Sequence, residues 1–303
     1  MIDSGEGLKQ IPLEHPTKES ILIPIPEHPP HVDSDNATAW IGESVDDQQM
    51  KAIKEKVVAN IQHIGFDEFR ENLDKSIDNF NEMINQDNSP FWVLWDAGPH
   101  KSRRWVYHLS EDRLTRKPTA AVYFSVLNEK RDRRILQKAV EQDIKSFVIF
   151  DDASYGGSQI GHDIEVVVRL YREMGHPAPQ FFLVVPYITN RAKDYISQIE
   201  ETRVTWFNSQ VILSLGEQLS EEELTYAQQH HFQFTPYGYY TPRSFDRVIT
   251  FFDHSVPDMR SFDMQVGEFI DRNGFIRPYA DPDKPFYEYE EGEYDKYLSS
   301  YGK

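Results

Sequence analysis

Two adjacent acids followed by a glycine-containing turn are the feature of the chain best suited to chemistry. Asp151 and Asp152 come directly after the apolar run of residues 147–150, and Gly156 and Gly157 follow shortly afterwards. The run predicts a buried strand that ends at the acids, and the glycines predict a tight turn. Strand-end carboxylates can accept hydrogen bonds from sugar hydroxyls, and backbone amides at a helix start can hold a phosphate. The stretch therefore predicts a site for a phosphorylated ligand.

The elements around this stretch predict an α/β fold, a mostly parallel sheet flanked by helices. Apolar residues at helical spacing follow the turn, and Gly175 stands where a helix C-cap belongs. Short apolar runs predict further strands over 91–95, 119–127, 181–187, 204–213 and 248–252, and periodic segments predict helices around 105–109, 135–144, 190–201 and 220–230. Such alternation is typical of a parallel sheet covered on both faces.

The pattern divides the chain into four parts. Residues 1–38 are rich in proline and predict an extended arm that could dock on the body or on a second subunit, as in a homo-oligomer. Residues 39–88 predict a helical cap or packing layer, residues 89–277 the main α/β domain, and residues 278–303 an aromatic, acidic tail that wraps the surface. The second cap helix has the clearest apolar stripe, formed by Phe66, Phe69, Leu73, Ile77, Phe80 and Ile84.

Composition limits the partners. The formal net charge of the 303 residues is -18, with 50 acids against 32 Lys plus Arg, so general binding to nucleic acid or to an anionic membrane is disfavoured. The chain has no cysteine, which excludes disulfides and thiolate chemistry and is compatible with a reducing cytosol. No apolar segment is long enough to span a membrane. We therefore expect a cytoplasmic protein.

The stretch from residue 147 to residue 159 resembles the phosphoribosyl-diphosphate (PRPP) loop of type I phosphoribosyltransferases, in which an apolar strand, two acids and a short turn precede a helix. The resemblance implies that Asp151 and Asp152 hold the ribose hydroxyls and are the catalytic acids. It implies a phosphate loop made of Ala153, Ser154, Tyr155, Gly156, Gly157, Ser158 and Gln159. It also implies Mg²⁺ as a cofactor, PRPP or a nucleotide as ligand, and a nucleobase as the default acceptor.

Two groups of cations lie where the family has its diphosphate-binding turn and its mobile cationic loop. Lys101 and Arg103 occupy the first position, and Lys130 and Arg131 lie near the second. Arginine can grip diphosphate oxygens with two parallel hydrogen bonds, which would give these cations a chemical purpose in an acidic protein. The alternative is that each is part of a solvated helix start.

The turn departs from the family at two positions. Gly156 and Gln159 replace the usual hydroxyl residues, which leaves Ser154 and Ser158 as nearby hydroxyls, and Tyr155 replaces the acidic base of purine-salvage members. Three functions follow as hypotheses: transfer of phosphoribose to a nitrogen acceptor, a catalytically altered fold that binds a nucleotide or a protein, and a nucleotide-sugar glycosyltransferase whose acid pair binds metal.

A second polar cluster, Asp253, His254 and Asp258, follows the strand predicted over 248–252. Two acids and an imidazole at a strand end suit base recognition or metal binding in the same cleft. The alternative is a hydrogen-bonded turn with a structural histidine. The ligand set of any metal is not defined by the sequence.

Overall fold

The computed structural model describes residues 29–86, 88–95, 101–124, 129–230, 246–255 and 270–271. Most of the proline-rich arm, residues 231–245, the predicted acid Asp258 and the C-terminal tail lie outside the described residues. Within the described ranges, no helix combines the length and the apolar character that crossing a membrane requires.

The central sheet has five strands in the order β4-β3-β5-β7-β9, and every neighbouring pair in it is parallel. The strands are β3 (Phe91–Trp95), β4 (Ala120–Tyr123), β5 (Ser146–Phe150), β7 (Gln180–Val184) and β9 (Arg203–Phe207). The predicted α/β class with a parallel sheet is confirmed. The chain winds outward from β3 to β4 and then returns to the other side of β3 with β5, so the order of strands reverses between β3 and β5. Ligands of open α/β sheets bind at the carboxyl ends of the strands at such a switch point.

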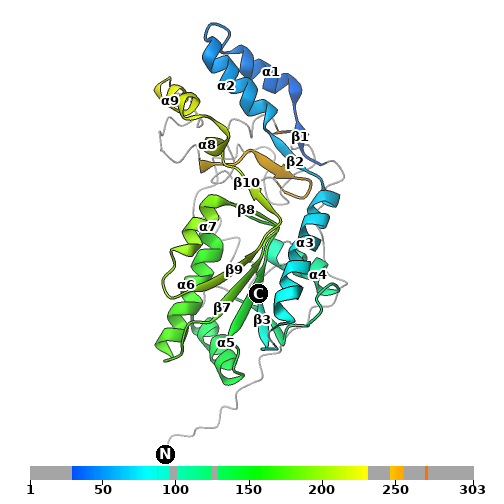
Figure 1. The fold of residues 1–303 in the computed structure, drawn as a ribbon, viewed down its shortest axis with the longest axis vertical. Coiled ribbons are helices and arrows are strands. Elements are labelled where there is room, and N and C mark those ends of the chain that lie inside the picture. The colour runs from blue at the N-terminus through cyan, green and yellow to red at the C-terminus, as the bar shows by residue number, and fades with distance from the viewer. Residues whose placement is uncertain are drawn as a thin grey trace, which may run out of the picture.

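Helices cover both faces of this sheet (Figure 1). One face carries α3 (Phe66–Ile84) and α4 (Ser102–Glu111), and the other carries α5 (Glu129–Glu141), α6 (Ser158–Glu173) and α7 (Asn190–Ser197). Side chains alternate along each strand, so Val148 and Phe150 pack in the cluster on the α3 side while Phe147 and Ile149 pack in the cluster on the α6 side. The core is therefore two layers divided by one sheet, and the loops at the carboxyl end are held from both faces.

The helix α3 owes its position to its apolar stripe. Phe69, Leu73, Ile77 and Phe80 have no exposed surface, and the Phe80 ring packs 5.3–6.3 Å, centroid to centroid, from aromatic rings on β3, β5, β7 and β9. Burying each such side chain contributes about 1.5–3 kcal/mol. This predicted helix thus forms one layer over the central sheet.

Three strands of the central sheet continue, after a break, into a smaller parallel sheet of order β10-β8-β6. Its strands are β6 (Ala153–Ser154), β8 (Tyr187–Thr189) and β10 (Gln210–Ile212), which follow β5, β7 and β9 respectively. The sequence predicted single strands over 181–187 and 204–213, whereas each is divided. Pro186 has no N–H for the ladder, and its carbonyl instead accepts the amides of Ser209 and Gln210. The acid pair occupies the corresponding break between β5 and β6.

The remaining elements gather at one end of the molecule, beyond the small sheet (Figure 1). They are β1 (His31–Val32), α1 (Ser34–Gly42), α2 (Gln48–Ala59), β2 (Gln62–Ile64), α8 (Leu215–Gln218), α9 (Glu221–Gln229), β11 (Thr250–Phe252) and β12 (Ile270–Asp271). The strand β11 pairs in parallel with β2, directly before α3. This pairing brings the segment that carries Asp253 and His254 back to the start of α3.

Candidate functional site

Asp151 and Asp152 lie at the carboxyl end of β5, the middle strand of the central sheet. Asp151 is buried, and its Oδ1 accepts hydrogen bonds from Ser102 Oγ at 2.6 Å and from the Asp152 amide at 3.0 Å. Asp152 is half-buried, and its Oδ1 accepts the Ala153 amide at 2.8 Å. The backbone at the strand end and the start of α4 therefore fix both carboxylates at the switch point.

Arg103 reaches across the switch point from α4. Its Nε lies 3.4 Å from Asp151 Oδ2, and its Nη1 donates to Asp163 of α6. The Arg103 residue is only 2% exposed, so the guanidinium lies within the protein rather than in solvent. We call Ser102, Arg103, Asp151 and Asp163 the charged network. The network joins the two faces of the sheet over the carboxyl ends of β3 and β5.

Asp152 has a different partner, His254, in the turn after β11. His254 Nε2 lies 3.2 Å from Asp152 Oδ2. Burial is the largest single influence and raises the pKa of Asp152. The interactions with His254, together with the other hydrogen bonds of the carboxylate, outweigh burial, so the pKa lies below the ordinary value of an aspartate. The fold thus joins the predicted acid pair to one member of the second polar cluster.

Gly157 is the N-cap of α6, and its backbone conformation explains why this position needs glycine. Its φ is 71°, in the left-handed region, and a Cβ there would lie 2.8 Å from the carbonyl oxygen of Ala192. The Thr189 hydroxyl donates to the Tyr155 carbonyl and accepts the Ala192 amide at 3.1 Å, which ties the loop to α7. Because Gly157 has no side chain to cap α6, the amides of the first turn are suited to an anion.

The other residues predicted for the loop differ in their access to solvent. Ala153 and Ser154 are buried on β6, Tyr155 and Gly156 are half-buried, and Ser158 and Gln159 are exposed at the start of α6. Of the two hydroxyls left by the departures from the family pattern, only that of Ser158 therefore faces solvent beside the helix start.

The predicted diphosphate cations fall into two kinds. Lys101 precedes α4 and Lys130 lies in the first turn of α5, and both are exposed. Arg131 is half-buried and stacks its guanidinium 4.2 Å from the centre of the Tyr123 ring. All these positions follow the carboxyl ends of β3 and β4, whereas Arg103 is turned inward to two acids. The exposed lysines are thus better placed to meet an anion than Arg103.

Asp253 has a structural role at the start of α3. Its Oδ2 accepts the Phe66 amide at 2.8 Å, and its Oδ1 lies 2.6 Å from His63 Nε2. Gly65 is the N-cap of α3 and has no side chain, so Asp253 supplies the missing cap from a distant part of the chain. Asp253 therefore holds its segment against the start of α3, whereas His254 contacts Asp152.

Two residues of the charged network, Ser102 and Asp163, escaped the sequence prediction. Asp163 carried a usable signal, because it lies between the apolar residues Ile160 and Ile164 on the buried stripe of α6. An acid on such a stripe requires a buried partner. Ser102 gives no comparable signal, since a serine at a helix start is commonplace.

The described residues contain no group of three or more side chains that could hold a metal ion by themselves. Magnesium commonly binds through one or two carboxylates together with substrate phosphates. The adjacent carboxylates of Asp151 and Asp152 fit that kind of site, in which the ligand completes the coordination.

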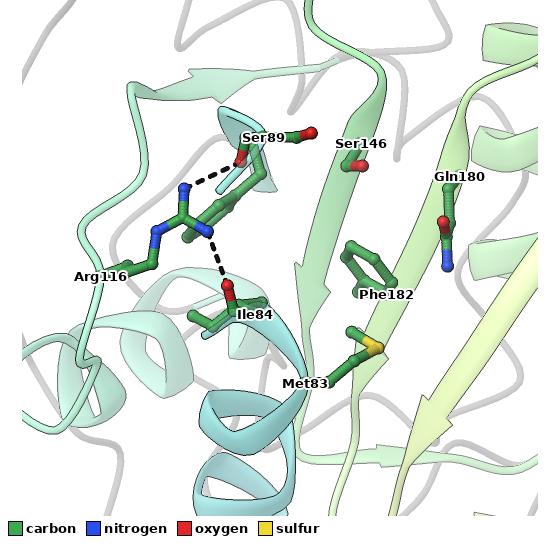
Figure 2. Close-up of a pocket in the computed structure, with 8 residues that line it drawn as sticks. Met83, Ile84, Ser89, Arg116, Ser146, Gln180 and Phe182 are labelled. Atoms are coloured by element: carbon green, nitrogen blue, oxygen red, sulfur yellow. Dashed lines mark hydrogen bonds between the residues drawn. The ribbon is translucent and has the colours of Figure 1, made fainter. Parts of the chain in front are cut away.

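A small pocket also lies at the opposite, amino end of the strands (Figure 2). It encloses about 100 Å³ between α3 and the starts of β3, β5 and β7, and Arg116 donates there to the carbonyls of Ile84 and Ser89 at 2.7 and 2.9 Å. Ligand pockets usually measure about 300–1,000 Å³. This pocket is small by comparison, and its arginine ties two backbone segments together.

The parallel sheet, the strand-end acids and the glycine turn define a phosphoribosyltransferase-like protein, in agreement with the family resemblance. The chain belongs to the PRTase-CE family, whose model matches residues 37–265. The matched span includes the acid pair, the phosphate-loop candidate and the segment with His254. No curated protein and no solved structure gives a significant match to the chain.

Proposed function

We propose that the loop over residues 151–159 binds PRPP or a related ribose phosphate. The observation that carries this proposal is the order of groups at the switch point: two carboxylates at the end of β5, then a left-handed Gly157, then the start of α6. The ligand's 5′-phosphate would accept hydrogen bonds from the first-turn amides and from Ser158. Its ribose hydroxyls would donate to Asp151 and Asp152.

The reaction that this site would support is transfer of phosphoribose to a nitrogen acceptor such as a nucleobase. The acceptor nitrogen forms a bond to C1 of the ribose as the bond from C1 to the diphosphate oxygen breaks. The carboxylates would stabilise positive charge developing on the sugar, and Lys101 and Lys130 would stabilise the departing diphosphate. Mg²⁺ would be held by Asp151 or Asp152 with the diphosphate and would neutralise part of its charge.

One observation favours a second candidate, a ligand-binding module without transfer chemistry. Arg103 lies where the family binds diphosphate, yet it contacts two acids of its own chain. The loop also has Gly156 and Gln159 in place of hydroxyl residues. A protein of this kind would bind PRPP or a nucleotide and release no diphosphate.

Calorimetric titration with PRPP and Mg²⁺ tests the shared part of both candidates. We expect saturable binding that the double change Asp151→Asn and Asp152→Asn abolishes. Asp143→Asn is a matched control, because Asp143 is exposed and has a φ of 55°, which asparagine tolerates. Absence of binding by the unaltered protein would reject both candidates.

One further measurement distinguishes the transferase from the binding module, and another tests whether Lys101 binds the diphosphate. Diphosphate release with a panel of nucleobases indicates transfer, and binding without release indicates the ligand-binding module.

Lys101→Gln should weaken PRPP binding by about tenfold, because roughly one charge-assisted contact with the diphosphate is lost. The same substitution should leave the binding of ribose 5-phosphate unchanged. Lys145→Gln, at the amino end of β5, is the control and should affect neither ligand.

A further inference from the structure

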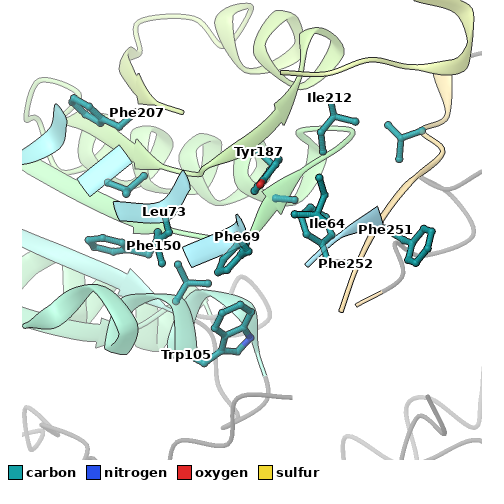
Figure 3. Close-up of a cluster of buried hydrophobic side chains, with 14 of the residues drawn as sticks. Ile64, Phe69, Leu73, Trp105, Phe150, Tyr187, Phe207, Ile212, Phe251 and Phe252 are labelled. Atoms are coloured by element: carbon teal, nitrogen blue, oxygen red, sulfur yellow. The ribbon is translucent and has the colours of Figure 1, made fainter. Parts of the chain in front are cut away.

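His254 occupies an unusual place for a polar side chain. The residue is 2% exposed, and its ring centre lies 4.8 Å from Phe69, 5.0 Å from Trp105 and 5.1 Å from Phe252. We call these three residues, with Phe66 at 6.4 Å, the aromatic cage. Figure 3 shows that Phe69, Trp105 and Phe252 converge from three different segments of the chain. By its surroundings, this position suits an apolar ring.

The hydrogen bonds of the imidazole are few. Nε2 contacts Asp152 Oδ2 at 3.2 Å, and Nδ1 has no hydrogen-bond partner in the part of the chain that the structure describes. Leaving a buried polar atom unpaired costs about 1–3 kcal/mol. A phenylalanine would fill the same cage without that cost. The contact with Asp152 is therefore the feature that distinguishes histidine from a better-packing residue here.

The geometry points to His254 as a positioning residue that holds the Asp152 carboxylate for the ribose hydroxyls. The tautomer with its proton on Nε2 fits these observations, since this nitrogen then donates to the carboxylate, whereas Nδ1 has no acceptor among the described residues to which it could donate. With the Ala153 amide on Oδ1 at 2.8 Å and His254 on Oδ2, the carboxylate is held at both oxygens. Each oxygen keeps a second lone pair for a ligand. This role rests on the proposed binding of a ribose phosphate.

The cage also explains how so distant a residue can be placed accurately. Asp253, the residue before His254, is fixed to the start of α3 through the Phe66 amide, and β11 pairs with β2. The imidazole is thus held by packing on three sides and by the backbone next to it. Such support is what a positioning group requires, because small displacements weaken a hydrogen bond steeply.

Two substitutions of His254 separate positioning from packing. His254→Phe keeps an aromatic ring in the cage and removes the donor. We expect a urea midpoint close to that of the unaltered protein, because loss of the hydrogen bond to Asp152 offsets the relief of the unpaired Nδ1, and PRPP binding weakened about tenfold. His254→Gln keeps an N–H donor and places an amide among aromatic rings, so we expect a lower urea midpoint and binding closer to that of the unaltered protein. His176→Phe, at an exposed position after α6, is the control and should change neither property.

The outcomes are distinguishable from failure of the proposed function. If the unaltered protein binds PRPP and His254→Phe binds equally well, the positioning role is wrong and the proposed function stands. If the unaltered protein does not bind PRPP, the proposed function and the positioning role of His254 in ligand binding are both wrong. Proton–nitrogen NMR of the imidazole then tests the contact itself: a slowly exchanging proton on Nε2 supports the hydrogen bond to Asp152, and a proton only on Nδ1 overturns it.

Discussion

Asp151 and Asp152 are neighbours in the chain, yet one belongs to the charged network and the other faces the aromatic cage. The network is built within the α/β core, from α4, the end of β5 and α6. The cage draws on α3, α4 and β11, and its histidine comes from a segment beyond the central sheet. The acid pair is thus the point at which two differently stabilised parts of the molecule meet.

The comparison shows that two adjacent carboxylates can be held in place in different ways, one by a buried opposite charge and the other by a hydrogen-bond donor that is held by apolar packing. Around Asp151, the buried Arg103 compensates the charges of Asp151 and Asp163. Removal of the arginine therefore leaves both carboxylates buried without the opposite charge of its guanidinium. Around Asp152, apolar packing holds a single hydrogen-bond donor, so the donor can be removed while the packing is retained. We therefore expect substitutions on the charged side to affect folding and those on the aromatic side to affect binding.

The largest expected effect follows from Arg103→Met, which leaves Asp151 and Asp163 buried without the guanidinium. We expect a loss of about 3–5 kcal/mol in the free energy of unfolding, measured by urea denaturation. Adding Asp163→Asn to this variant should restore part of the loss, because one buried charge is then removed. A loss below about 1 kcal/mol for the single substitution would show that the network does not depend on Arg103.

The next effect concerns the turn that joins the acids to α6. Gly157→Ala should destabilise the protein by about 1–3 kcal/mol, because alanine resists the left-handed conformation and its Cβ would crowd the Ala192 backbone. Gly156→Ala is the matched control for folding, since its Cβ would meet no atom closer than 4.0 Å. Equal denaturation midpoints for the two variants would contradict this explanation of the turn.

A smaller effect is expected at Asp253, which anchors the segment carrying His254. Asp253→Ala removes the cap of α3 and should cost about 1 kcal/mol in thermal or urea unfolding. Asp253→Asn keeps an oxygen for the Phe66 amide and should cost less. If both variants were as stable as the unaltered protein, the contact with α3 would not contribute to stability.

The smallest expected effect is a pH dependence of the free energy of unfolding that arises from Asp152. The pKa of Asp152 is lowered in the folded protein, so its ionised form contributes stability that is present above the unfolded pKa of about 3.9 and is lost as the pH falls through the folded pKa. The difference in unfolding free energy between the unaltered protein and Asp152→Asn should therefore shrink as the pH falls below about 4. A difference that stays constant across this range would exclude the effect.

Much of the fold could be predicted from the sequence because its signals are local. The stripe of α3 repeats at helical spacing, the apolar runs mark buried strands, and Gly157 marks a turn that excludes side chains. The acid pair was recognisable because it directly follows such a run. The division of two predicted strands was not foreseen, although Pro186 offered a local reason for one of the breaks.

The sequence by itself determined the sheet, its covering helices and the place of the acids at a strand end, since periodicity and turn chemistry act over a few residues. Only the tertiary structure decided what each acid contacts. Arg103 could serve equally as an anion ligand or as an internal partner until α4 and α6 were brought together over the sheet. Likewise His254 gained its role from the pairing of β11 with β2, because a contact between distant segments leaves no local pattern in the chain.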